Sequence, residues 1–106
     1  MDSAIQVVTT TDKREDAERI ARTLVEKRLA ACVQLVGPII STYRWKGRIE
    51  TTEEWQCWAK TGEGFYEDIE KTIKSIHPYE LPEIIALPIL RGSSEYLTWL
   101  HNELRV

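Results

Sequence analysis

Two long strand-forming segments around a three-residue turn constrain this chain most. Residues 31–45 (ACVQLVGPIISTYRW) and 49–61 (IETTEEWQCWAKT) flank Lys46-Gly47-Arg48, and both are rich in the β-branched and aromatic residues that favour extended backbone. A short turn joins antiparallel neighbours, so we predict a long β-hairpin. Gly37-Pro38 interrupts its first arm. Because proline cannot donate a ladder hydrogen bond, we expect a bulge or bend at that point.

The helices predicted on either side are too short to cover this hairpin. Residues 13–28 and 65–76 both place apolar side chains at helical spacing. Asp12 with Glu15 resembles a capping box before the first helix, and Pro78 ends the second. A helix of about 16 residues spans about 24 Å, whereas an arm of about 13 residues spans about 43 Å. The hairpin should therefore project beyond its helical cover.

The remaining segments complete a β-α-β-β-α-β order followed by one more helix. Residues 4–10 and 82–90 are predicted strands, and a serine at 93 or 94 caps a helix that runs to about residue 103. This order predicts an α+β, ferredoxin-like fold in one domain, residues 1–106. Both main helices should lie on one face of an antiparallel sheet. The last strand should lie at the edge beside the first, where Pro88 is tolerated.

The far end of the predicted hairpin is apolar. A solitary chain would leave these side chains in water beside an unpaired strand edge. A second subunit would cover them, so we expect a symmetric oligomer. The alternative is a hairpin that curls back onto its own sheet at Gly37-Pro38. The side chains expected at the subunit interface are Ile39, Ile40, Tyr43, Trp45 and Ile49.

Charge and composition exclude several classes of protein. The formal net charge is −3, which disfavours a general nucleic-acid partner because such binding needs a clustered basic surface. No apolar run approaches the roughly 18–20 residues of a membrane span. The first residues, Met-Asp-Ser-Ala, lack the features of a signal peptide. We therefore expect a cytoplasmic location, with no membrane partner.

Neither the cysteines nor the common enzyme motifs point to a catalytic or structural-metal site. Cys32 and Cys57 lie on the paired arms with an expected offset of four residues, about 13 Å, which is too far for a disulfide. We interpret them as two buried thiols. The spacing of Cys32, Cys57, His77 and His101 matches no zinc-binding motif within one chain. A site that gathers ligands from several subunits remains an alternative. No G-x-S-x-G, G-x-G-x-x-G, P-loop or H-E-x-x-H is present, so no enzyme is predicted.

The segment HPYELPE carries more polar groups than a simple turn requires. His77, Tyr79, Glu80 and Glu83 follow the second helix between two prolines. One interpretation is a binding site, and the other is a rigid corner whose histidine and tyrosine satisfy backbone groups. Lys60 is a candidate charged partner for Glu83, and at a buried interface Lys60 could bind an anion.

Six segments spread along the chain form a recognisable pattern: LAACVQ (29–34), TYRWKGRIE (42–50), Lys60-Thr61, HPYELPEI (77–84), ALPI (86–89) and YLTWL (96–100). Together they resemble the CutA divalent-cation tolerance family over essentially the whole chain. The resemblance implies a ferredoxin-like protomer in a tight homotrimer with interlocking hairpins, unusual thermal stability, and a link to copper tolerance and divalent-metal binding. The architecture is also similar to that of PII-type trimeric signalling proteins.

The resemblance transfers only part of a metal site. Some bacterial members have a cysteine at the end of the first strand and two consecutive histidines before the Pro-Tyr pair as proposed ligands. The matching positions here are Thr9 and Ile76, and only His77 is kept. The residues that match family motifs and are expected to line an intersubunit pocket are Cys32, Lys60, His77, Tyr79, Glu83 and Trp99.

Three hypotheses follow. The first is a non-enzymatic trimer that requires no cofactor and binds copper or another divalent cation, with His77, Glu80 and Glu83 as ligands. The second is a PII-like sensor or adaptor that binds a small anionic effector or a partner protein in a cleft formed by Cys32, Lys60, Tyr79 and Trp99. The third is a very stable trimer that anchors another protein through its termini.

Overall fold

The computed structural model describes residues 3–105. Its order of elements confirms the predicted α+β arrangement, and a short 3-10 helix, η1, precedes the second main helix. The elements are β1 (Ala4–Thr11), α1 (Arg14–Glu26), β2 (Cys32–Trp45), β3 (Arg48–Gly62), η1 (Glu63–Phe65), α2 (Tyr66–Ile76), β4 (Ile84–Pro88) and α3 (Ser94–Glu103).

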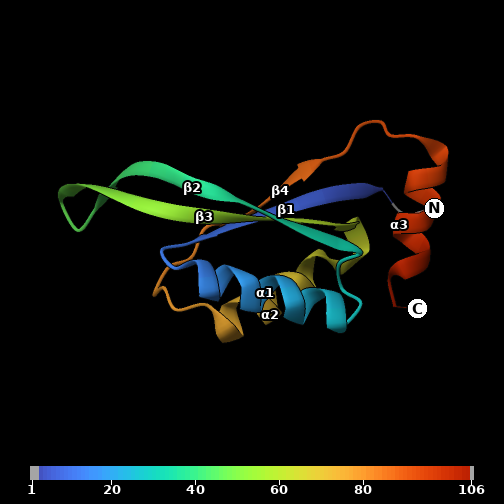
Figure 1. Ribbon diagram of the computed structural model, residues 1–106, viewed down its shortest axis with the longest axis horizontal. Helices are drawn as coiled ribbons and strands as arrows, with labels where there is room; N and C mark the ends of the chain where they lie inside the picture. Colours follow the sequence, from blue (N-terminus) through green and yellow to red (C-terminus); the bar gives the residue numbers. More distant parts are fainter. Residues whose placement is uncertain (1–2, 106) are drawn as a thin grey trace.

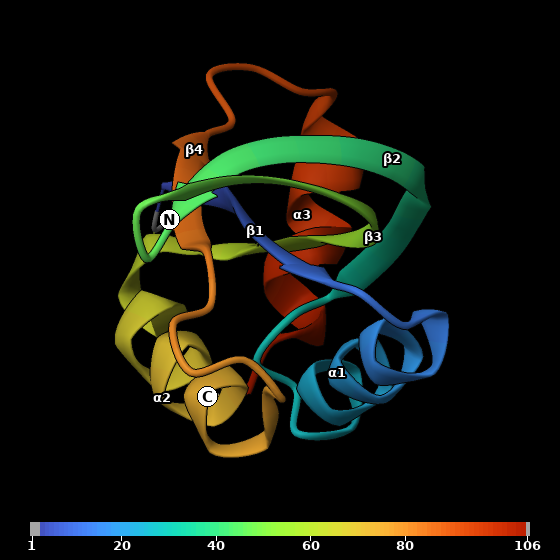
Figure 2. The same cartoon turned by 90° about the vertical axis from the view of Figure 1, so that its left-hand side faces the viewer.

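The four strands form one antiparallel sheet in the order β2-β3-β1-β4. Helices α1 and α2 lie side by side against one face of this sheet, and α3 stands at the end opposite the hairpin tip (Figures 1 and 2). Strand β4 occupies the edge beside β1 as predicted, with Pro88 opposite Ile5. It is shorter than the predicted 82–90, because in the described part of the chain it pairs only with β1, and the register with β1 ends at Thr9 and Ile84.

The core lies between α1, α2 and the covered face of the sheet. Helices α1 and α2 each point one apolar stripe inward, and Ile20, Leu24, Ile69 and Ile73 are at most 1% exposed. Val7 of β1 packs against them from the sheet. Burying each such side chain stabilises the fold by about 1.5–3 kcal/mol, which anchors the sheet to its helices.

The start of α1 differs from the prediction. Lys13 is the N-cap residue and no side chain caps the helix, so the capping box predicted at Asp12 and Glu15 is wrong. The Thr11 hydroxyl instead donates to the Lys13 carbonyl at 2.8 Å. The helix begins one residue too late for the Asp12 side chain to act as its cap.

Strands β2 and β3 form the predicted hairpin, which extends well past the helices (Figure 1). The molecule measures 45 × 25 × 20 Å, and its longest dimension runs along the hairpin from the tip to α3. The ladder shifts register between Val36 and Ile39, which confirms the bulge predicted at Gly37-Pro38; that peptide bond is cis. The hairpin does not curl back onto its own sheet, and Ile40 and Ile49 are each 68% exposed.

A close backbone approach at the bulge requires a glycine. A Cβ atom at Gly37 would lie 2.7 Å from Trp55 Cδ1 and 3.2 Å from the Glu54 carbonyl oxygen. We predict that Gly37→Ala lowers the free energy of unfolding by about 1–3 kcal/mol, because the packed indole must shift. Urea unfolding at one fixed protomer concentration measures this loss. Glu18→Ala, at an exposed position of α1, is the control, with a change within about 0.5 kcal/mol. Equal losses in the two variants would contradict the account.

Candidate functional site

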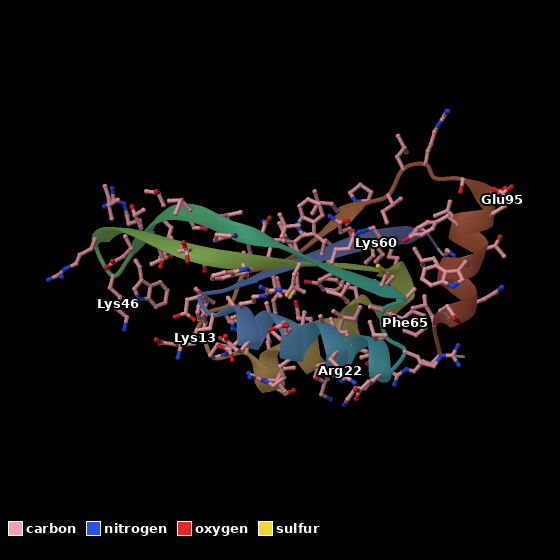
Figure 3. All side chains as sticks on the ribbon, viewed as in Figure 1. Lys13, Arg22, Lys46, Lys60, Phe65 and Glu95 are labelled. Carbon is pink, nitrogen blue, oxygen red and sulfur yellow. The ribbon has the colours of Figure 1, made fainter. Side chains whose placement is uncertain are left out.

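The residues predicted to form a site lie in two groups at opposite ends of the sheet. His77, Tyr79, Glu80 and Glu83 belong to the corner loop, residues 77–83, between α2 and β4. Lys60 lies toward α3, whereas Lys46 marks the hairpin tip (Figure 3). One protomer therefore does not bring all of the predicted site residues together.

His77 fastens the corner loop to the end of β1. Its Nε2 lies 2.8 Å from the Thr10 carbonyl oxygen, and the Tyr79 backbone N–H donates to its Nδ1 at 3.1 Å. Since Nδ1 accepts, Nε2 carries the proton and the ring is neutral. Burial lowers the pKa of His77 below its ordinary 6.5, although the Thr10 carbonyl and the charges of Asp16, Glu54 and Asp12 oppose this shift. These contacts match the rigid-corner interpretation.

Tyr79 connects the corner loop to β3. Its hydroxyl donates to Oε2 of Glu54 at 2.7 Å, and its ring meets the His77 ring in an edge contact with centroids 4.8 Å apart. Burial, the hydrogen bond to Glu54 and the charge of that carboxylate raise the pKa of Tyr79 above its ordinary 10.0. The hydroxyl therefore stays protonated and remains a donor to Glu54.

Glu54 is the residue of this site that sequence reasoning missed. It is only 5% exposed, while the neighbouring Glu53 is exposed. In the sequence Glu54 belongs to an acidic, polar part of the hairpin and looks like its neighbours. It lies opposite Ile39, directly after the bulge, where the corner loop packs against β3. No signal in the sequence distinguishes it, because its burial depends on a loop 25 residues away.

A hollow of about 630 Å³ opens between the hairpin and the corner loop, and we call it the hairpin cavity. Its size is within the range of small-molecule sites. Glu80 at its edge is exposed and lies 3.8 Å from the Lys46 ammonium, an arrangement of little energetic value at the surface. Its lining includes three carboxylates and three aromatic rings: Glu54, Glu80, Glu83, Tyr43, Trp45 and Tyr79.

The predicted metal ligands do not form a metal centre within one protomer. No group of three or more His, Cys, Asp or Glu side chains in residues 3–105 is placed to hold a metal ion. Both ring nitrogens of His77 are already engaged, so His77 would have to give up a hydrogen bond to bind a metal. The ligand set His77, Glu80 and Glu83 stays a prediction for an assembly of several subunits.

The other group of predicted residues lies near α3. Lys60 donates to Oε1 of Gln34 at 2.5 Å and does not form the predicted charged pair with Glu83 within one protomer. Lys60 pairs with Gln6 near the start of β1, whereas Glu83 precedes β4 at the opposite end. Trp99 lies on α3 with its ring centroid 5.6 Å from that of Tyr96. Tyr79 can join Cys32, Lys60 and Trp99 only across a subunit boundary.

The two cysteines are free thiols with different environments. Cys57 is buried beneath α1 and donates to the Ala17 carbonyl at 3.3 Å, and burial raises its pKa to about 12. Cys32 is only partly buried, so the prediction of two buried thiols holds for Cys57 alone. The partner of Cys57 is Leu35, three residues after Cys32 rather than the expected four. An odd separation places the two thiols on opposite faces of the sheet.

The element order and sheet order define a ferredoxin-like α+β protein with an extended hairpin. The family model described as CutA1 divalent ion tolerance protein matches residues 5–103. The chain belongs to this CutA1 family. The divalent-cation tolerance protein CutA of Thermus thermophilus is 44% identical over 96 residues, which cover 91% of this chain and 93% of the relative. Protein CutA of Mus musculus is 46% identical over 86 residues, 81% of this chain and 49% of that protein.

Solved structures of the family have the same fold. CutA1 from Oryza sativa superposes with a TM-score of 0.95 at 38% identity, covering 98% of this chain and 95% of the other. The Thermus thermophilus protein gives a TM-score of 0.93 at 40% identity, covering 96% and 99%. The chain thus spans nearly all of the bacterial relative but about half the length of the mouse one.

The comparisons leave the cellular location a prediction. A relative from Arabidopsis thaliana is named chloroplastic, and a structurally similar CutA from Archaeoglobus fulgidus is named periplasmic. Within residues 3–105, no helix combines the length and apolar character needed to cross a bilayer.

The neutral state of His77 predicts a pH dependence of stability. Because the pKa of His77 in the folded chain lies below 6.5, the unfolded chain binds the proton more readily. Stability is therefore lost as the pH falls below about 6.5, and the loss ends below the folded-state pKa. We expect the stability advantage of the wild type over His77→Gln to shrink between about pH 7 and about pH 5.

Two measurements check this prediction. Denaturant unfolding of both proteins at one protomer concentration gives the stability difference at each pH. An NMR titration of the His77 ring gives its pKa, which should lie below 6.5. A pKa at or above that value, or a stability difference that grows as the pH falls, would refute the neutral-ring assignment.

Proposed function

We propose that this chain contributes to divalent-cation tolerance as a non-enzymatic homotrimer that binds copper or another divalent cation at sites shared between subunits. The observation that carries the proposal is the apolar hairpin end in a member of this family. Ile40 and Ile49 are each 68% exposed and Tyr43 is 41% exposed, beyond the reach of the helices. The family model and the Thermus thermophilus relative are named for tolerance to divalent ions and not for a reaction.

The uncovered face of the sheet supports the same assembly. Val8 and Gln6 lie opposite Ile85 and Leu87 on the face away from α1 and α2, and Ile85 and Leu87 are 48% and 45% exposed. Strand β4 also has one edge with no neighbouring strand among residues 3–105. A second subunit that covers this face and the hairpin end would remove both apolar surfaces from water.

Of the predicted interface residues, Ile39 and Trp45 are partly covered within the protomer. Ile40, Tyr43 and Ile49 are the ones left exposed, so they should contribute most to assembly.

The proposed metal site also requires more than one subunit. With no three-ligand group assembled in residues 3–105, a shared site would take donors from more than one subunit.

The sensor hypothesis is less well supported. Its anionic effector requires a positively charged cleft, but Lys60 is hydrogen-bonded to Gln34 at the α3 end. The largest group of predicted residues instead surrounds a cavity lined by three glutamates. We therefore favour cation binding over anion binding.

Assembly is tested by introducing charge at the hairpin end. We expect the wild type to have a solution mass about three times that of the protomer, and Ile40→Glu with Ile49→Glu to shift the mass downward because two carboxylates would be buried without partners. Size-exclusion chromatography with light scattering measures the masses. Val25→Glu, at an exposed aliphatic residue of α1, is the control and should leave the mass unchanged. A monomeric wild type, or a double variant that stays trimeric, would rule out this interface.

Copper binding is tested by calorimetry on the assembled protein. We expect His77→Gln to weaken copper binding by about tenfold or more, as loss of a ligand or of its support does in metal sites. His101→Gln removes the other histidine and should bind as the wild type does. Equal affinities of the wild type and His77→Gln would remove His77 from the ligand set.

A further inference from the structure

The hairpin cavity contains a buried carboxylate without a cationic partner. Glu54 is 5% exposed, and the Tyr79 hydroxyl occupies its Oε2. Throughout residues 3–105 no lysine, arginine or histidine forms an ion pair with Glu54, and no donor is bonded to its Oε1. Buried carboxylates are costly unless they are paired or bind a cation. Glu54 therefore favours a positively charged occupant.

The walls of the cavity suit an organic ammonium group. Trp45, Tyr43 and Tyr79 line it, and the faces of such rings attract cations. The chain's own Lys46 shows this attraction, since its ammonium lies 5.6 Å from the Trp45 ring centroid and 3.8 Å from Glu80. Lys46 is 70% exposed, so this contact at the edge is exchangeable, and it leaves Glu54 unpaired.

The spacing of the carboxylates favours a ligand with several ammonium groups over a single metal ion. Glu54, Glu80 and Glu83 all line the cavity, yet they are not close enough to one another to form a three-ligand metal group. A single small ion cannot contact carboxylates that are spread around a volume of about 630 Å³. A flexible chain with several ammonium groups can contact these carboxylates at the same time, and its methylene groups can pack against the aromatic rings.

We propose that the hairpin cavity binds a linear aliphatic polyamine, with one ammonium group at Glu54 and another at Glu80 and Glu83. The ligand lies along the wall formed by Tyr43 and Trp45. The polyamine site shares Glu80 and Glu83 with the ligand set predicted for copper, but it also uses Glu54 and requires neither His77 nor a metal.

Spermidine is the probe, titrated by calorimetry into the full chain in its native assembly at constant ionic strength. We expect Glu54→Gln to weaken binding by about tenfold or more, as loss of one member of a buried charge pair does. Glutamine is similar in size and still accepts the Tyr79 hydrogen bond, so the variant should fold. Glu53→Gln removes the same charge from the exposed neighbouring position and should stay within about twofold of the wild type.

A second variant tests the site without touching Glu54. Lys46→Gln frees Glu80 and should tighten spermidine binding by about twofold or more, whereas Lys71→Gln on the outer surface of α2 should have less effect. Several outcomes would overturn the proposal. These are no spermidine binding by the wild type, equal weakening in Glu54→Gln and Glu53→Gln, or equal displacement by magnesium at the same charge concentration. If a side chain of a second subunit fills the cavity, the wild type will not bind spermidine. Copper binding measured on the same variants keeps the two proposals distinguishable.

Discussion

The pairing of β2 with β3 far beyond the helices governs the rest of this structure. Helix α1 has 13 residues and spans about 20 Å, whereas β3 has 15 residues and would span about 50 Å if fully extended. The backbone groups that face each other across the two arms are hydrogen-bonded along this ladder, so the hairpin extends without support from the helices. Its side chains have no such partner, and Ile40 and Ile49 remain exposed. The need to cover them leads to the proposed assembly.

The corner loop is the second element on which the candidate site depends. His77 bonds to β1 through Thr10, and Tyr79 bonds to β3 through Glu54, so one short segment connects α2 to two strands of the sheet. These contacts hold His77 neutral and bury a carboxylate beside the hairpin. The loop that the sequence suggests as a metal-binding segment thus holds α2 against β1 and β3. The neighbouring Glu54 contributes a buried negative charge to the adjoining cavity.

Several parts of this fold could be predicted from local patterns. The stripe Ile69 and Ile73 predicted α2, Gly37-Pro38 predicted the bulge, and Pro88 was consistent with an edge strand. These features depend on backbone chemistry and on periodicity, which act over a few residues. The capping box at Asp12 failed because the exact start of a helix depends on small shifts that such patterns do not resolve. The Lys60–Glu83 pair does not form within one protomer, because the separation of these two residues depends on strand register.

By itself, the sequence determined the order of elements, the apolar faces of α1 and α2, and a hairpin longer than its helices, because each follows from residue type and spacing along the chain. Only the tertiary structure decided which polar groups meet. It paired Tyr79 with Glu54, engaged both nitrogens of His77, and separated Lys60 from the corner loop. Those contacts join residues distant in sequence, and their geometry is set by the register of the sheet and the path of the corner loop, which residue spacing does not encode.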